Sequence, residues 1–214
     1  MENSNNTDHK SGINLTKYQI KIVESVLELF SEKGYFQVSF DEISNESGIT
    51  GSTIKYHFKS KNNLYDQVFN YCNNQLISFI EQDFRKTGNV KQALEYIWIN
   101  RARWGFKNPI KMKFIYTRAA FAINNLFEYE DKLLKNTIHC GIKNRSLIGY
   151  QNPNYIVCLF YAFNNSIIIS MTGKRYGDKQ KIMVVKKAFN IFYEAIKRSE
   201  NLQPDEINEE FPSE

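Results

Sequence analysis

Hydroxyl, phenol and amine side chains gather in one short stretch of the chain, from Gly48 to Lys61. Groups of these kinds can bond to phosphate oxygens and to the edges of bases, and the amines also neutralise phosphate charge. The stretch holds no carboxylate, and none occurs between Glu46 and Asp66, although 23 of the 214 residues are acidic. A carboxylate there would repel a polyanion, so this composition favours contact with nucleic acid.

The chain offers little for catalysis. Its histidines are His9, His57 and His139, and His139 has Cys140 beside it. Neighbours on a helix point about 100° apart, which is a poor arrangement for a nucleophile and its base. No HExxH, CxxC, phosphate-loop or dinucleotide-binding pattern occurs. We therefore expect no catalytic residue, no cofactor and no metal, and an enzyme is the less favoured alternative.

Length and composition fit a soluble globular protein with one large domain, or a small domain and a larger one. The apolar run 155–171 is interrupted by Asn164, Asn165 and Ser166, which argues against a membrane span. The N-terminus lacks the apolar core of a secretory signal. Three widely spaced cysteines are typical of reduced thiols, so we expect a cytoplasmic protein.

Two short helices are predicted to position the polar stretch. Ser39 is typical of a helix N-cap, and a glycine is expected to end the helix that it begins. Thr50 is a second N-cap candidate, for a helix of about two turns. Ile54 and Phe58 would point inward from this helix and leave its polar residues outward. The segment 39–58 is therefore predicted to be a helix-turn-helix.

The outward side chains of this segment are the predicted DNA contacts. Lys59 and Lys61 lie beside the N-terminus of the next helix, whose free N–H groups favour a phosphate. The simpler alternative is a solvated helical hairpin inside an α bundle. The full set of predicted contacts is Ser39, Thr50, Gly51, Ser52, Thr53, Lys55, Tyr56, His57, Lys59 and Lys61.

The rest of the chain also favours helices. It has only four prolines and ten glycines, and no window alternates convincingly at period two. We expect an all-α fold of about nine helices, in which a three-helix helix-turn-helix domain precedes a larger helical domain. The predicted parts are a disordered polar tail 1–14, a DNA-binding domain 15–64, a larger domain 65–200 and a disordered acidic tail 201–214. The later helices are predicted at 90–106, 110–126, 128–148, 154–172 and 178–199.

One long run carries a family resemblance. The run FDEISNESGITGSTIKYHFKSKNNLYDQVF, preceded by IVESVLELFSEKGY, resembles the DNA-binding domain of the TetR family of bacterial transcriptional regulators. The resemblance covers roughly residues 16–76 without a gap. Ser52 stands where a glycine is usual, and Lys55 where the first aromatic of a pair is usual. Both departures lie on the outer face, so they bear on the operator sequence and leave the fold expectation intact.

The resemblance implies a homodimeric regulator with an effector-binding domain. Two recognition helices would enter successive major-groove segments of a pseudo-palindromic operator. Effector binding would move the long helix that starts near Lys61 and release the DNA, so a repressor is favoured. An architectural DNA-binding protein of the same fold, without an effector, is the alternative.

Two C-terminal helices are candidates for the dimer interface. Residues 154–172 are apolar nearly all round, as in a helix that packs on two sides. A fully buried helix within one subunit is the equal alternative. The second candidate helix, 178–199, would contribute a stripe of apolar residues to the interface: Ile182, Val185, Phe189, Phe192 and Ile196.

Two arginines interrupt predicted apolar stripes, Arg101 in 90–106 and Arg118 in 110–126. A buried guanidinium must be paired, hydrated or available to an anion. We therefore hypothesise an effector pocket for an amphipathic ligand with an acidic head group, such as a fatty acid or an acyl thioester. Its lining would be Arg101, Trp104, Phe114, Arg118, Phe121, Tyr155 and Asn164.

A simpler interpretation of Arg101 needs no ligand. It pairs the arginine with Glu95 or Glu128, or lets the side chain reach along the surface to water. We favour it because helical stripes are often misphased when they are inferred from sequence.

Overall fold

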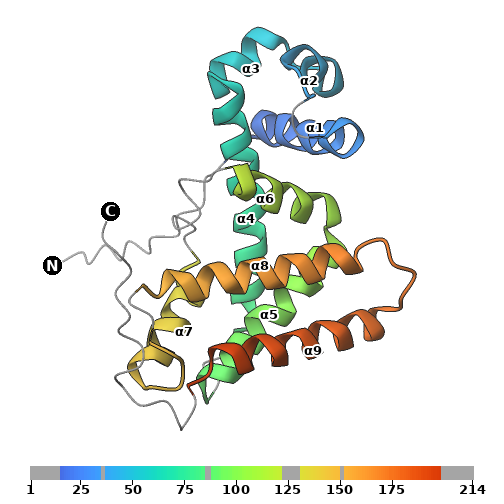
Figure 1. Cartoon of the computed structure of the whole chain (residues 1–214). Coiled ribbons are helices and arrows are strands. Elements are labelled where there is room, and N and C mark those ends of the chain that lie inside the picture. The colour runs from blue at the N-terminus through green and yellow to red at the C-terminus, as the bar shows by residue number, and fades with distance from the viewer. Residues whose placement is uncertain (1–14, 35–36, 85–87, 122–130, 150–151, 199–214) are drawn as a thin grey trace, which may run out of the picture. The chain divides into compact units, whose positions relative to one another are not determined.

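The computed structural model of the chain describes residues 15–34, 37–84, 88–121, 131–149 and 152–198 (Figure 1). In these residues the regular secondary structure is helical, apart from one isolated β-bridge. This confirms the all-α prediction. The predicted tails 1–14 and 201–214 lie outside the described residues. The helices are α1 Lys17–Lys33, α2 Phe40–Ser47, α3 Gly51–Phe58, α4 Lys61–Gln82, α5 Val90–Lys107, α6 Pro109–Phe121, α7 Lys132–Lys143, α8 Asn154–Met171 and α9 Asp178–Ile196.

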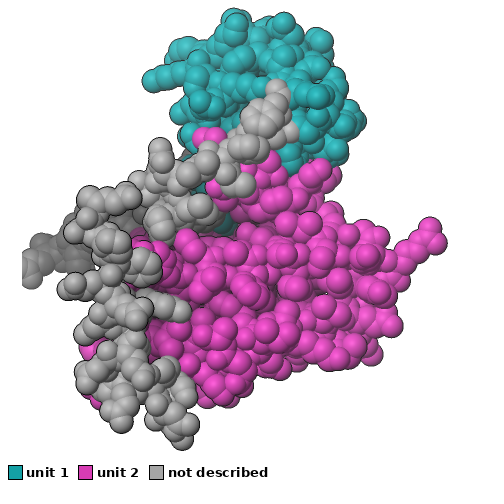
Figure 2. Space-filling view, viewed as in Figure 1, with its two compact units in different colours: residues 1–75 teal, residues 76–214 magenta. Residues whose placement is uncertain are grey.

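The chain divides into two compact units, Met1–Gln75 and Leu76–Glu214 (Figure 2). The division falls within α4, whereas the sequence placed a domain boundary after residue 64, near the start of that helix. The first turns of α4 belong to unit 1, where the Tyr71 hydroxyl donates to Glu24 of α1 at 3.3 Å. The last turn belongs to unit 2, where the Tyr96 hydroxyl donates to the carbonyl oxygen of Ile80 at 3.2 Å. One continuous helix therefore contributes to both units.

Unit 1 is built from helices with well-defined ends. Thr16 caps α1 in a reciprocal capping box with Gln19, and Ser39 caps α2 in the same way. Gly48 ends α2 with φ +64°, a left-handed conformation that glycine adopts without strain. Helix α2 packs against both α1 and α3. The apolar core includes Val23, Phe30, Ile43, Ile54 and Phe58, each at most 2% exposed.

Unit 2 packs α5 against α7, α8 and α9, and α8 against α9. Trp98 of α5 lies at the centre of an aromatic cluster, with ring centroids 5.1 Å from Phe160 and 5.1 Å from Phe192. Its indole N–H donates to the carbonyl oxygen of Val185 at 3.0 Å. The polar atom of this buried ring is therefore satisfied, as burial requires.

The prediction of a helix as far as residue 148 is wrong, because α7 ends at Lys143. Arg145 has φ +62°, which a continuing helix cannot accommodate. Leu147 then pairs antiparallel with Lys197, after the end of α9. This pairing involves a distant segment, which local periodicity does not report. The predicted helical residues 122–126 and 128–130 lie outside the described residues.

Helix α8 is long and apolar enough to cross a membrane, judged by length and composition within the described residues. This is weak evidence, because core helices of soluble proteins satisfy the same test. Its buried residues include Ile156, Phe160 and Asn164, which face the interior of unit 2.

Candidate nucleic-acid interface

Helix α3 is held in place by its cap and two apolar side chains. Oγ1 of Thr50 accepts a hydrogen bond from the backbone N–H of Thr53 at 3.3 Å, which caps the helix as predicted. Ile54 and Phe58 are fully buried, which confirms that they point inward. The other face of the helix is thereby turned outward.

The outward face carries the polar groups that the sequence singled out. Ser52, Thr53 and Lys55 are exposed, and Tyr56 is 81% exposed. Gly51 and His57, also on α3, are half-buried. Their contact with DNA stays a prediction.

The hydroxyls at the start of α3 form a small network. Oγ1 of Thr50 lies 3.0 Å from Oγ of Ser52 and 2.8 Å from Oγ1 of Thr53. Because each hydroxyl has both a donor and an acceptor site, Ser52 and Thr53 can still bond to a base or a phosphate. The network fixes the positions of the Ser52 and Thr53 hydroxyls on the outer face of α3.

The turn between α3 and α4 is tight and strained. The backbone N–H of Ser60 donates to the carbonyl oxygen of Phe58 at 2.5 Å, across Lys59. Lys59 has φ +56° and ψ −48°, which is a γ-turn of the rare positive-φ kind. The side-chain oxygen of Ser60 accepts from the N–H of Asn63 at 3.1 Å and so caps α4. Lys61 then begins α4 with its Nζ 5.5 Å from the ring centroid of Tyr65.

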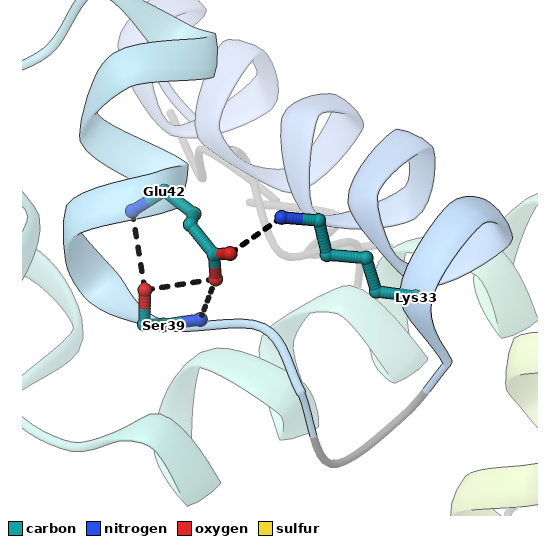
Figure 3. A network of polar contacts seen from close by, with 3 residues as sticks. All are labelled: Lys33, Ser39 and Glu42. Atoms are coloured by element: carbon teal, nitrogen blue, oxygen red, sulfur yellow. Dashed lines mark hydrogen bonds and ion pairs between the residues drawn. The ribbon is translucent and has the colours of Figure 1, made fainter.

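Ser39 is engaged within the protein (Figure 3). Its backbone N–H and its hydroxyl both lie 2.8 Å from Oε2 of Glu42, and its Oγ accepts from the N–H of Glu42 at 3.3 Å. Oε1 of Glu42 pairs with the ammonium of Lys33. The hydrogen bond from Lys33, followed by those from Ser39, lowers the pKa of Glu42 to about 2. The Ser39 hydroxyl therefore secures α2, and its contact with DNA also stays a prediction.

In unit 2 the structure joins two of the predicted effector residues. Nε of Arg101 donates to Oδ1 of Asn164 at 3.2 Å. Two further contacts were not predicted: Nη2 of Arg101 donates to Asn165 at 3.1 Å, and the guanidinium stacks on Tyr161. These partners lie 60 and 64 positions after Arg101 in the chain, and no sequence signal linked them to it.

Arg101 does not reach along the surface, since it is only 2% exposed. It forms no ion pair with Glu95, and Glu128 lies outside the described residues. The other predicted effector residues differ in exposure, and their part in an effector site stays a prediction. Trp104 and Phe114 are buried, Arg118 is half-buried and has a partner of its own, Tyr155 is 55% exposed, and the side chain of Phe121 lies outside what the structure describes.

The chain is similar to known regulators. Residues 22–68 match the family described as bacterial regulatory proteins, tetR family. Over 182 residues it is 24% identical to the biofilm operon icaADBC HTH-type negative transcriptional regulator IcaR of Staphylococcus epidermidis, covering 82% of this chain and 93% of that protein. The IcaR of Staphylococcus aureus strain Newman is 34% identical over 74 residues, which is 35% of this chain and 40% of that protein.

Solved structures share the fold. A TetR family transcription regulator from Marinobacter aquaeolei VT8 superposes with a TM-score of 0.69 at 16% identity, covering 85% of this chain and 96% of that one. The helix-turn-helix and its outward polar face define a DNA-binding regulator of transcription. Residues 22–68 thus form a DNA-binding domain of the TetR family of bacterial transcriptional regulators, and the chain as a whole has the fold of TetR-family regulators. Proteins of this family are not enzymes, which removes the catalytic alternative.

Proposed function

We propose that the protein is a cytoplasmic repressor that binds a pseudo-palindromic operator as a homodimer and is released by a small amphipathic ligand. The observation that carries this proposal is the outward face of α3, where hydroxyls, a phenol and a lysine stand without a carboxylate. The assignment as a repressor draws on the IcaR relative, whose name describes a negative regulator.

The dimer is proposed to form through α8 and α9, with a second copy of the chain as the partner. Four large apolar residues of α8 are between 39% and 55% exposed: Tyr155, Leu159, Phe163 and Ile169. At about 100° per residue they fall within roughly a third of the helix circumference. Four residues of the stripe predicted for α9 cannot form the interface, because they are at most 2% exposed within the subunit: Val185, Phe189, Phe192 and Ile196. The large apolar residues that α9 does expose are Met183 and Ile191, at 52% and 68%. Apolar surface this concentrated is typical of an interface, and a two-fold axis would pair the same patch on both subunits.

Release is proposed to act through α4. Two residues separate this helix from α3, and its last turn belongs to unit 2. A ligand that shifts α4 in unit 2 would change the separation of the two recognition helices in the dimer. A coupling free energy of about 1–3 kcal/mol is typical of allostery and would change operator affinity 5–150-fold.

Footprinting on the intergenic DNA beside the gene tests the operator. We expect one protected pseudo-palindrome whose half-sites are about one helical turn apart or a multiple of it. Comparable binding to many unrelated duplexes would instead favour an architectural protein.

Sedimentation of Phe163→Asp tests the dimer. A carboxylate in the interface is expected to give monomers and to reduce operator affinity. Ile110→Glu is the control, because it places a charge at an apolar residue of α6 that is 40% exposed. Dimers of undiminished stability in Phe163→Asp would exclude α8 from the interface.

A further inference from the structure

The guanidinium of Arg101 is buried in unit 2 among neutral partners. Arg101 is 2% exposed on α5. Its Nε and Nη2 donate to the side-chain oxygens of Asn164 and Asn165, at 3.2 and 3.1 Å. Its Cζ lies 4.7 Å from the ring centroid of Tyr161. Two carboxamide oxygens and an aromatic face therefore surround a full positive charge.

No carboxylate comes within ion-pair distance of this guanidinium in the part of the chain that the structure describes. Asp131 is connected to it indirectly, because the Tyr161 hydroxyl donates to Oδ2 of Asp131 at 3.1 Å. The other oxygen of Asp131 accepts from the backbone N–H of Leu134 at 2.9 Å and caps α7. That carboxylate is thus already engaged. The charge on Arg101 lacks the directly paired anion that a buried cation usually requires.

Part of the guanidinium is unused. A guanidinium offers five N–H donors in a planar fork. The bond to Asn164 uses the N–H of Nε, and the bond to Asn165 uses one of the two N–H groups of Nη2. Nη1 and the second N–H of Nη2 donate to no acceptor among the described residues. These donors can bond to the oxygens of a carboxylate.

The fork is also held in a fixed orientation. Nδ2 of Asn164 donates to the carbonyl oxygen of Trp98 at 3.1 Å, which turns Oδ1 of Asn164 toward Arg101. Asn164 is itself 1% exposed. Because the guanidinium is positioned before a ligand arrives, little side-chain entropy is lost on binding.

We infer that Arg101 is the receptor for the carboxylate of a small monocarboxylate with an apolar body. Trp98 and Trp104, one turn away from Arg101 on either side, are buried, so the surroundings suit an apolar chain or ring. A buried carboxylate–guanidinium pair makes strong charge-assisted bonds, since water competes weakly there. Entry requires local opening of the helix packing, so association is expected to be slow. The inference rests on the proposed function in so far as this ligand is the effector.

Three ligands of equal chain length test the head group: octanoate, octanamide and octylamine. In calorimetric titrations of the full-length protein, octanoate is expected to bind at least about tenfold more tightly than octanamide, since the amide lacks the charge. Octylamine is expected not to bind. Arg101→Gln should lose the preference for octanoate. Arg103→Gln is the matched control, because it removes an exposed arginine from the same helix and should bind octanoate like the wild type.

Equal affinity of the wild type for octanoate and octanamide would overturn the inference, as would undetectable octanoate binding. Octanoate affinity in Arg101→Gln equal to that of the wild type would do the same. If Arg101→Gln does not fold, Arg101→Lys takes its place. Lysine keeps the charge but loses the planar set of N–H donors, so we expect octanoate affinity to fall several-fold. An unchanged affinity would refute the role of the guanidinium fork.

Operator binding is measured in the same samples to separate this site from the proposed function. Octanoate that binds through Arg101 and leaves operator affinity unchanged would uphold the carboxylate site and contradict ligand-induced release. Release by some other compound, without octanoate binding, would support the proposed function and overturn the carboxylate site.

Discussion

The ammonium of Lys33, at the end of α1, lies 2.5 Å from Oε1 of Glu42, in the first turn of α2. The second oxygen of the same carboxylate accepts from the backbone and the hydroxyl of Ser39. A single side chain therefore both completes the cap of α2 and joins α2 to α1. Because α2 packs against α3, this contact also helps to hold α3, the proposed recognition helix, in place.

The lowered pKa of Glu42 predicts a pH dependence of stability. The fold favours the ionised carboxylate and lowers the pKa from 4.5 to about 2, chiefly through the hydrogen bond from Lys33. The stabilisation is therefore present above pH 4.5 and is lost as the pH falls toward 2. Over this interval the melting temperature of the wild type should fall more steeply than that of Glu42→Gln. Glu46→Gln, an exposed acid on the same helix, should behave like the wild type.

The strained turn at Lys59 predicts that glycine is the more stable residue there. A non-glycine residue in such a conformation costs about 1–3 kcal/mol, and glycine avoids most of that cost. Lys59→Gly should therefore raise the free energy of unfolding by about 1 kcal/mol, measured by urea denaturation. Lys59→Ala keeps the strain and should not raise it. Both variants lose the amine, so a fall in DNA affinity common to both reports the charge alone. Equal stability of the two variants would mean that the turn is unstrained.

Lys61 is predicted to contact a phosphate without reading sequence. It begins α4, where free backbone N–H groups and the helix dipole also favour an anion. Lys61→Ala should weaken binding to every duplex alike and lower the slope of log affinity against log salt by about one. Thr53→Ala should instead change the preference between operators. Lys179→Ala makes the same charge change outside unit 1 and should leave the slope as it is. A wild-type slope in Lys61→Ala would remove this lysine from the interface.

Sequence reasoning succeeded where the signal is local. The caps at Ser39 and Thr50 and the end of α2 at Gly48 depend on hydrogen bonds and backbone angles within a few residues, and all three are found as predicted. It failed at the end of α7, because the antiparallel pairing of Leu147 with Lys197 joins segments 50 positions apart.

The partners of Arg101 show the same limit. The apolar stripe of α5 suggested a buried arginine, but the favoured interpretation paired Arg101 with Glu95 or Glu128 or let it reach water, whereas it is 2% exposed. Asn165 and Tyr161 are brought to it by the packing of α8 on α5, which sequence periodicity alone does not determine. The side chains that orient the guanidinium therefore became visible only in the structure.

Gly141 of α7 is predicted to tolerate no side chain. A Cβ at this position would lie 2.5 Å from Cδ1 of Leu147 and 2.9 Å from Cγ1 of Val90. Leu147 is 1% exposed and belongs to the turn that pairs with the end of α9, so it has little room to move. Gly141→Ala should therefore lower the free energy of unfolding by about 1–3 kcal/mol. Gly149→Ala is the control, since nothing lies within 4 Å of its Cβ.

A second substitution distinguishes this steric conflict from a general effect on α7. Leu147→Ala alone should cost about 2–5 kcal/mol, because it leaves a cavity. In the double variant the new methyl group occupies part of that cavity, so the combined loss should be smaller than the sum of the two single losses. Urea denaturation of the four proteins in the cycle measures this difference. Strict additivity would show that Gly141 and Leu147 do not compete for the same space.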